Sequence, residues 1–223
     1  MTVRAMTWSM TWSTLDAPGP HGLQTAAMRT TFALVMATVL LAGCGGKVAQ
    51  TCPPTKEIAT SNVVKVGDTW DVNITANIEA PVDKVFEAAI HPENGHDLVP
   101  ESLLKTELVS EEGSSKLMDI VIRLDVLPPG FKVQNVRNQY TYYPQEKRFT
   151  TKSIDFKLAD ITAEYKFEPS ADGKGTTLKF TQKSKDKSPM ILDSLQQGAQ
   201  CETFAVQAKV VRRALGLEQK PAS

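Results

Sequence analysis

The chain has 223 residues, of which 41% are hydrophobic and 22% are charged, a composition typical of one globular domain with some additional unstructured sequence. Basic and acidic residues balance at 25 each, so the chain has no positive excess that would attract nucleic acid. Composition therefore argues against nucleic-acid binding and for a single folded domain.

Residues 28–43 have the order of a secretory signal peptide. Arg29 supplies a positive charge, an apolar run follows from Phe32, and small residues end it at Gly43. The run is far shorter than the roughly 20 residues that span a bilayer as a helix. We therefore expect an export signal and not a permanent membrane span. Residues 1–27 precede this signal, so either translation begins at Met28 or these residues are an extended leader.

The end of the signal, Leu41-Ala42-Gly43-Cys44, is similar to the lipobox of bacterial lipoproteins. The resemblance implies a diacylglyceryl group on the Cys44 sulfur, cleavage before this residue, and acylation of the new amino terminus. Several acyl chains on one residue give a stable membrane anchor. Gly45 stands where aspartate is the enterobacterial retention signal, which implies the outer membrane, facing the periplasm. The alternative is an ordinary signal peptide whose cleavage site precedes a buried or paired cysteine.

Residues 44–62 are polar and show neither a helix nor a strand period, so they are interpreted as a lipidated tether. Residues 63–217 are assigned to the folded domain, and residues 218–223 to a tail.

The first clear element is a strand. From Trp70 to Ile78, apolar and polar residues alternate strictly, which predicts a half-buried strand. A helix is expected next, over residues 81–89, because Pro81 and Asp83 suit a helix amino end and Val85 and Phe86 belong to one apolar face. A short second helix at 93–98 is possible, although Gly95 weakens it.

Further strands alternate with turn residues, and the chain then ends in a helix. The predicted strands cover residues 103–110, 118–126, 132–143, 147–158, 161–167 and 176–183. Short connections between them predict an antiparallel sheet. Apolar residues at steps of three and four predict one amphipathic helix from Met190 to Leu217. Gly198 lies inside it, which indicates a close packing contact or a slight bend.

The order of these elements, together with Ala80-Pro81-Val82 and Val85-Phe86 after the first strand, resembles the START-like, helix-grip superfamily (SRPBCC), which includes polyketide cyclases and lipid-transfer domains. The resemblance covers most of residues 63–217. It implies an α+β fold in which a curved antiparallel sheet of about seven strands wraps around the long C-terminal helix. It also implies an apolar cavity between sheet and helix.

Candidate wall residues for such a cavity are the apolar and aromatic residues on the inward faces of strands and helix. They are Ile120, Ile122, Leu124, Tyr140, Tyr142, Ile154, Phe156, Tyr165, Phe167, Leu178 and Phe180 from strands, and Phe204, Ala208 and Val211 from the helix. Each of them is equally suited to a filled hydrophobic core, so the cavity follows from the resemblance and not from these residues.

No catalytic residue, metal site or cofactor site is predicted. His91 and His96 with Glu93 and Asp97 are conceivable metal ligands, but their surroundings favour a solvated loop. The remaining polar candidates are more simply explained as surface groups, or as hydroxyls that would orient a ligand. They are the charged stripe Asp119, Arg123 and Asp125, the hydroxyls of Tyr140, Tyr142 and Tyr165, and the lysines at 179, 183, 185 and 187.

Two cysteines remain once Cys44 carries lipid. Export delivers Cys52 and Cys201 to a compartment where disulfides persist, so the two are candidates for a bridge. The alternative for Cys201 is a buried free thiol on the apolar stripe of the helix.

The function expected from these features is that of a membrane-anchored, non-enzymatic module that binds an apolar small molecule or lipid. One alternative is a cyclase- or hydrolase-like enzyme that uses the same cavity. Another is an interaction module whose core is filled.

Overall fold

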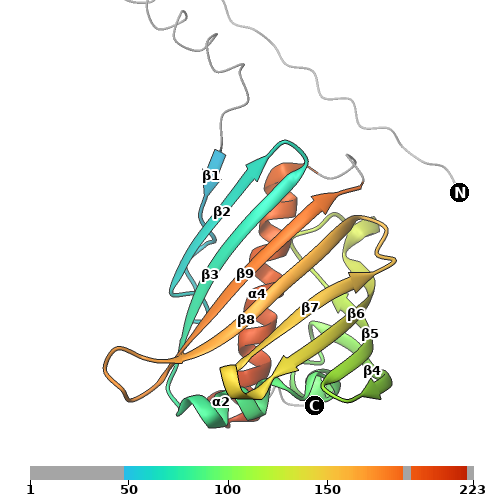
Figure 1. Ribbon diagram of the computed structural model, residues 1–223. Coiled ribbons are helices and arrows are strands. Elements are labelled where there is room, and N and C mark those ends of the chain that lie inside the picture. Colours follow the sequence, from blue (N-terminus) through green and yellow to red (C-terminus); the bar gives the residue numbers. More distant parts are fainter. Residues whose placement is uncertain (1–47, 188–191, 220–223) are drawn as a thin grey trace, which may run out of the picture. The chain divides into compact units, whose positions relative to one another are not determined.

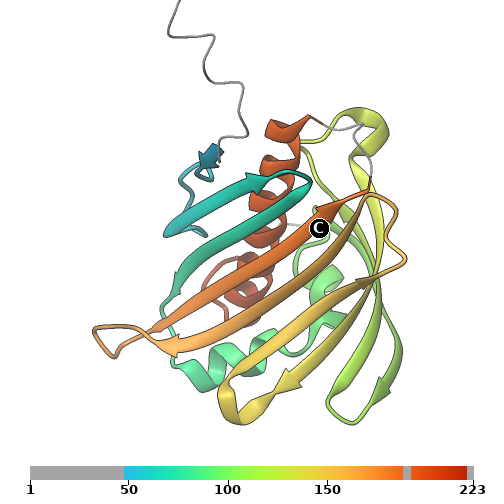
Figure 2. The same cartoon turned by 45° about the horizontal axis from the view of Figure 1, so that its top comes forward.

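The computed structural model describes residues 48–187 and 192–219. The leader at 1–27, the signal peptide at 28–43, Cys44 and the last residues of the tail lie outside the described residues. The described part has the predicted α+β helix-grip fold, in which one antiparallel sheet curves around the C-terminal helix α4 (Figures 1 and 2). The sheet has nine strands in the order β1-β2-β3-β9-β8-β7-β6-β5-β4.

The helices and strands follow the sequence in a simple order. They are β1 (Val48–Gln50), β2 (Thr60–Val66), β3 (Thr69–Ile78), α2 (Val82–Ala89), α3 (Gly95–Leu98), β4 (Leu103–Glu112), β5 (Ser115–Arg123), β6 (Val133–Tyr143), β7 (Arg148–Ile154), β8 (Ala159–Pro169), β9 (Thr176–Asp186) and α4 (Asp193–Ala214). Single turns of 3-10 helix occupy Pro92–Asn94, Pro129–Phe131 and Pro144–Glu146.

The alternation that predicted the first strand is confirmed in β3. Trp70, Val72 and Ile74 are buried with the rest of their face, and the strand pairs along its whole length with β9. Helix α2 follows as expected, with Pro81 at its cap and Val85 and Phe86 turned into the core. The short second helix is also present, because the turn at Pro92–Asn94 continues into α3.

The tether assignment is wrong for residues 48–62. This segment contributes β1 and the first residues of β2, which is why the sheet has nine strands and not about seven. Only Val63 of β2 is fully buried, so the segment lacks the apolar alternation that marks a half-buried strand. β2 pairs through its backbone with β1 and β3, and between β1 and β2 the side chains of Cys52 and Ile58 are buried.

Strand β7 is shorter than the predicted 147–158. It ends at Ile154, and Asp155 adopts a positive φ of 56°. A residue in this left-handed region breaks the two-residue alternation, so Ile154 and Phe156 do not share a face as predicted.

Helix α4 carries the inward stripe that the sequence predicted. Its described turns begin at Asp193 and end at Ala214, whereas Met190 and Ile191 of the predicted range lie outside the described residues. A Cβ added at Gly198 would lie 2.5 Å from a methyl group of Val126. Gly198 therefore permits a close packing contact between α4 and the loop after β5.

The core between sheet and helix is rich in aromatic rings. Phe149 stacks on Tyr165 at 4.5 Å, Tyr165 meets Phe180 at 4.8 Å, and Phe180 meets Phe204 of α4 at 5.3 Å between ring centroids. These contacts fill the space between the sheet and the middle of α4. None of the helices in the described part of the chain has both the length and the apolar character needed to cross a bilayer.

Candidate functional site

A cavity of about 160 Å³ lies between strands β5–β9 and the N-terminal half of α4. It begins where the aromatic packing ends and is partly open to solvent. Its lining consists of Leu103, Ile120, Ile122, Leu124, Leu127, Gln134, Val136, Asn138, Tyr140, Thr151, Phe156, Leu158, Ala159, Ile161, Ala163, Tyr165, Gln182, Ser184, Asp186, Gln196, Ala199, Gln200, Thr203 and Gln207.

Six of the predicted wall residues line this cavity. They are Ile120, Ile122, Leu124, Tyr140, Phe156 and Tyr165. Together with Leu103, Leu127 and Val136 they make much of the sheet side of the cavity apolar, as in most ligand sites, while Gln182, Ser184 and Asp186 of β9 add polar groups to it.

The other predicted wall residues lie elsewhere. Seven of them are buried in the core and do not reach the cavity: Tyr142, Phe167, Leu178, Phe180, Phe204, Ala208 and Val211. Ile154 was predicted wrongly for a different reason, since it lies on the opposite face of β7 from the buried Phe149 and Ser153. Contacts between the aromatic rings determine where the core ends and the cavity begins. Residue type alone does not predict these contacts.

Helix α4 presents a polar stripe to the cavity. Gln196, Gln200, Thr203 and Gln207 all line it, and their steps of four, three and four place them on one helical face. The Thr203 hydroxyl donates to the carbonyl of Ala199, so it is already partnered within the helix. The three glutamine amides therefore supply most of the hydrogen-bonding capacity on this side.

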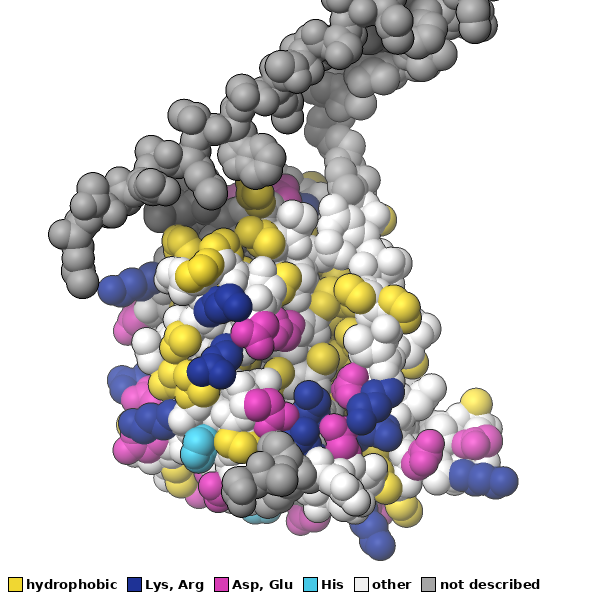
Figure 3. Space-filling model, turned by 180° about the vertical axis from the view of Figure 1, so that it is seen from behind, with side chains coloured by type: hydrophobic (Ala, Val, Ile, Leu, Met, Phe, Trp, Pro, Cys, Tyr) yellow, Lys and Arg dark blue, Asp and Glu magenta, His cyan; other side chains and the backbone are white. Residues whose placement is uncertain are grey.

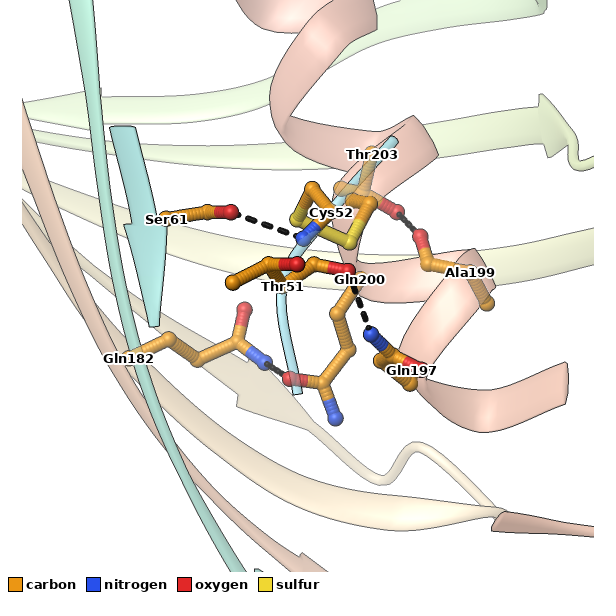
Figure 4. Close-up of a disulfide and its surroundings, with 9 residues drawn as sticks. Thr51, Cys52, Ser61, Gln182, Gln197, Ala199, Gln200 and Thr203 are labelled. Carbon is orange, nitrogen blue, oxygen red and sulfur yellow. Dashed lines mark hydrogen bonds between the residues drawn. A yellow bond between two sulfur atoms is a disulfide. The ribbon is translucent and has the colours of Figure 1, made fainter. Parts of the chain in front are cut away.

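Some of these amides are tied to the sheet. Gln182 of β9 donates through Nε2 to Oε1 of Gln200 at 3.3 Å, and Gln200 Nε2 donates to Oγ of Ser184 at 3.4 Å. Figure 4 shows the Gln182–Gln200 pair reaching from strand to helix. Such linked amides fix the orientation of the polar stripe, because turning one amide breaks its neighbour's bond.

A second polar group closes the end of the cavity near the start of α4. Trp70 Nε1 donates to Oδ2 of Asp186 and to Oε1 of Gln196, both at 3.1 Å. Lys65 Nζ lies 3.1 Å from the same Asp186 oxygen and 2.6 Å from Asp193 Oδ1. Burial alone would lower the pKa of Lys65, but its bonds to Asp193 and Asp186 outweigh this effect and raise it. Asp186 is thus already partnered by a cation and an indole.

The tyrosines of the site are proton donors and not bases. Burial raises the pKa of Tyr140 to about 12, and burial also raises the pKa of Tyr165. Tyr142, whose pKa is raised by burial as well, keeps its hydroxyl buried without a hydrogen-bond partner among the described residues. Both lining hydroxyls stay protonated at neutral pH, so they are able to orient a ligand but not to remove a proton from it.

His91 and His96 are exposed, and each lies within hydrogen-bonding distance of a neighbouring oxygen. His96 Nδ1 lies 2.8 Å from the carbonyl oxygen of Leu103, and His91 Nδ1 lies 3.1 Å from Glu93. Glu93 in turn accepts a bond of 2.9 Å from the buried Lys116. No cluster of three or more potential metal ligands occurs among residues 48–187 and 192–219. The predicted charged stripe likewise lies at the surface, where Asp119 forms a paired bond with Arg137.

Cys52 and Cys201 are joined by a disulfide, with their Cα atoms 5.6 Å apart (Figure 4). Both residues are buried, and Gln197 of α4 also donates to the carbonyl of Thr51 at 2.9 Å. The bond therefore fastens the segment between β1 and β2 to α4, one residue from the cavity-lining Gln200.

The polar lining was missed in the sequence, although two patterns indicate it. In β9, Gln182 and Ser184 continue the inward face of Leu178 and Phe180, where a filled core would require apolar residues. In α4, the glutamines recur at helical spacing beside the apolar stripe. Polar residues in phase with buried apolar ones are a sign of a polar cavity wall.

The comparisons with known proteins agree with this architecture. A family model described as polyketide cyclase / dehydrase and lipid transport matches residues 69–191, more than half of the chain. No curated protein matches.

Similar solved structures come from several organisms. A Thermus thermophilus protein aligns with a TM-score of 0.57 at 19% identity, covering 67% of this chain and 99% of its own. The Zhui aromatase/cyclase of a Streptomyces species aligns at 0.52 and 14% identity, covering 65% and 95%. A START superfamily protein from Mycobacterium smegmatis aligns at 0.53 and 12%, covering 66% and 99%. At these identities the likeness shows the fold alone, and with the family match it establishes that the chain belongs to the polyketide cyclase/dehydrase and lipid-transport family, with a START-like fold.

Proposed function

We propose that this chain is a lipid-anchored protein of the bacterial cell envelope that binds an apolar small molecule between its sheet and helix α4. The cavity carries the proposal, since a largely apolar sheet wall with a few polar groups faces a row of glutamine amides. Such a lining suits a ligand with a hydrocarbon or aromatic body and a few hydrogen-bonding groups. The lipobox-like sequence ending at Cys44 supports the anchor, and its Gly45 supports the outer membrane.

The volume limits the size of the ligand. An apolar cavity of about 150 Å³ holds one benzene molecule, and drug-sized ligands occupy about 300–1,000 Å³. At about 160 Å³ the cavity therefore takes one ring or a short stretch of acyl chain, with the rest of a larger ligand extending through the opening.

Binding is favoured over catalysis by the state of the titratable groups in the lining. Asp186 is held by Lys65 and Trp70, and burial raises the pKa of both lining tyrosines. An acid–base enzyme needs a group poised to exchange a proton near the working pH. The lining instead offers fixed hydrogen-bond donors and acceptors, which position a ligand without transforming it.

The direct test is native mass spectrometry of the chain from Gly45 onward, purified from cells without detergent. We expect a population heavier than the protein by one small molecule, which organic extraction releases and identifies as apolar. A protein that carries no such molecule and also fails to bind added apolar compounds would contradict the proposal.

The anchor is tested separately by Cys44→Ala. We expect this variant to remain unprocessed or misprocessed and to take up no labelled palmitate, because only the thiol accepts the diacylglyceryl group. The matched control is the Cys52→Ala variant, which keeps Cys44 and should be labelled as the parent is. Continued labelling of Cys44→Ala would show that the lipobox assignment is wrong.

A further inference from the structure

We infer that the cavity opens toward the lipid bilayer that holds the anchor, and that exposed apolar side chains around the opening rest on that bilayer. The inference builds on the proposed anchor and cavity, and adds an orientation that follows from where the chain enters the sheet.

The strand ladder places the opening and the entry of the chain at the same end of the domain. The start of β3 pairs with the end of β9 at Trp70 and Ser184, and the end of β9 pairs with the start of β8 at Asp186 and Ala159. Farther along the sheet, the start of β6 pairs with the end of β5. These strand ends, together with the start of α4, form what we call the mouth end, which lies uppermost in Figure 1.

The cavity reaches the surface at the mouth end. Gln134 at the start of β6, and Phe156 and Leu158 in the loop between β7 and β8, line the cavity there and are half-buried, whereas Tyr140 and Tyr165 farther in are buried. A ligand therefore enters and leaves through the mouth end.

Lys65 links the entry of the chain to the cavity wall. Val48, the first described residue, pairs with Lys65 in the β1–β2 ladder. Lys65 in turn binds Asp186 of the cavity lining and Asp193 in the first turn of α4. The first described residue of the sheet therefore lies beside Lys65, and Lys65 contacts Asp186 in the cavity lining.

The anchor is close to this point. Four residue steps separate Cys44 from Val48, so a fully extended connection reaches at most about 14 Å. The headgroup layer of one leaflet takes up roughly 5–7 Å of that reach. This connection is short, and the disulfide at Cys52 fixes the segment that follows it to α4. The mouth end of the domain therefore lies against the membrane.

The surface of the mouth end suits a lipid contact that does not depend on charge. Four large apolar side chains are exposed there: Leu192 at 71%, Val66 at 48%, Val133 at 47% and Val126 at 37%. Figure 3 shows hydrophobic side chains gathered on the upper half of the helix side, with most charged ones below. Four lysines of this end, Lys65, Lys132, Lys185 and Lys187, are each paired with an aspartate, whereas the exposed Lys157 and Arg123 have no ion pair among the described residues. Paired lysines contribute little attraction to anionic lipids.

The test measures quenching of tryptophan fluorescence in vesicles of brominated phosphatidylcholine that carry the full lipidated protein. Leu192→Trp places a reporter at the mouth end, and Leu217→Trp is the matched control beyond the opposite end of α4, where Leu217 is 37% exposed. Trp70, the remaining tryptophan of the chain after Cys44, is 1% exposed and serves as the shielded reference. Because an apolar contact sinks several ångströms into the interface, we expect roughly half or more of the added Leu192→Trp signal to be quenched and that of Leu217→Trp to be unchanged.

Quenching should also be the same at low and high salt and without anionic lipid. If both variants are quenched equally, the orientation is wrong. The orientation is also wrong if neither variant is quenched in protein shown by mass to carry lipid. Neither result contradicts the proposed cavity. Quenching that appears only with anionic lipid overturns the apolar contact. If mass spectrometry finds no lipid on the protein, the proposed anchor is wrong. Failure of the proposed function is therefore distinguishable from failure of this inference, which is tested only on lipidated protein.

Discussion

Removing the disulfide is expected to destabilise the domain by about 2–5 kcal/mol, one of the two largest effects that we predict. The bond joins residues 149 positions apart, so its loss releases a long loop in the unfolded chain. The variant is Cys52→Ala with Cys201→Ala in the chain from Gly45, which leaves no unpaired thiol. Denaturant unfolding followed by far-ultraviolet circular dichroism measures the change in the free energy of unfolding.

Treatment of the parent with a reducing agent is the control and should reproduce the loss. Hydrogen exchange adds a local result: β1 and the residues up to Thr60 should lose protection before the rest of the sheet, since β1 is a three-residue edge strand. A double variant as stable as the parent would show that the bond has no role in holding this segment to α4.

Trp70→Ala is expected to cost about 3–5 kcal/mol, the usual range for removing a large buried aromatic side chain. Trp70 is 1% exposed, donates to Asp186 and Gln196, and lies under the ammonium of Lys65, which is 5.0 Å from the ring centroid. Its loss therefore leaves a cavity and also removes a link between β3, β9 and α4.

Trp70→Phe separates these two contributions. It retains most of the apolar ring but has no N–H, so we expect a smaller cost of about 1–3 kcal/mol, with Asp186 still bound to Lys65. Thermal unfolding of both variants beside the parent measures the difference. Equal stability of Trp70→Ala and Trp70→Phe would mean that packing of the ring contributes nothing.

The sequence predicted those parts of the fold that have a visible period. In β3 and β8 the inward and outward residues alternate without interruption, so both strands were recognisable. β2 has no such period, because it buries one valine fully and is held by backbone bonds on both edges. A two-residue period in the sequence reflects alternating burial of side chains. A strand that is held mainly by backbone hydrogen bonds shows little of this period.

The sequence could not predict which inward residues lie in the core and which line the cavity, and the reason is a different one. Tyr165 and Phe180 are both inward aromatic residues of neighbouring strands, yet Tyr165 lines the cavity and Phe180 does not. The difference arises from the contact of Phe180 with Phe204 of α4, between residues far apart in the chain. The same holds for Cys52 and Cys201, whose pairing requires a proximity that only the folded chain provides.

This division also changes which substitution reports on the cavity. Ala208 was a predicted wall residue, but it is fully buried in the core, so a larger side chain there would overpack the core. Ala199 is half-buried and lines the cavity, and a phenyl ring at this position would occupy much of its volume. Ala205, on another face of α4 and also half-buried, provides a control with the same change in residue type.

Titration of the apolar dye N-phenylnaphthylamine into the parent, Ala199→Phe and Ala205→Phe proteins, each shown to be folded by circular dichroism, tests the central claim most directly. If the cavity between sheet and α4 is the binding site, Ala199→Phe should bind the dye at least about tenfold more weakly, a loss of about 1.4 kcal/mol, while Ala205→Phe should bind as the parent does. Equal affinity of all three folded proteins would contradict the account, because the dye would then bind outside this cavity.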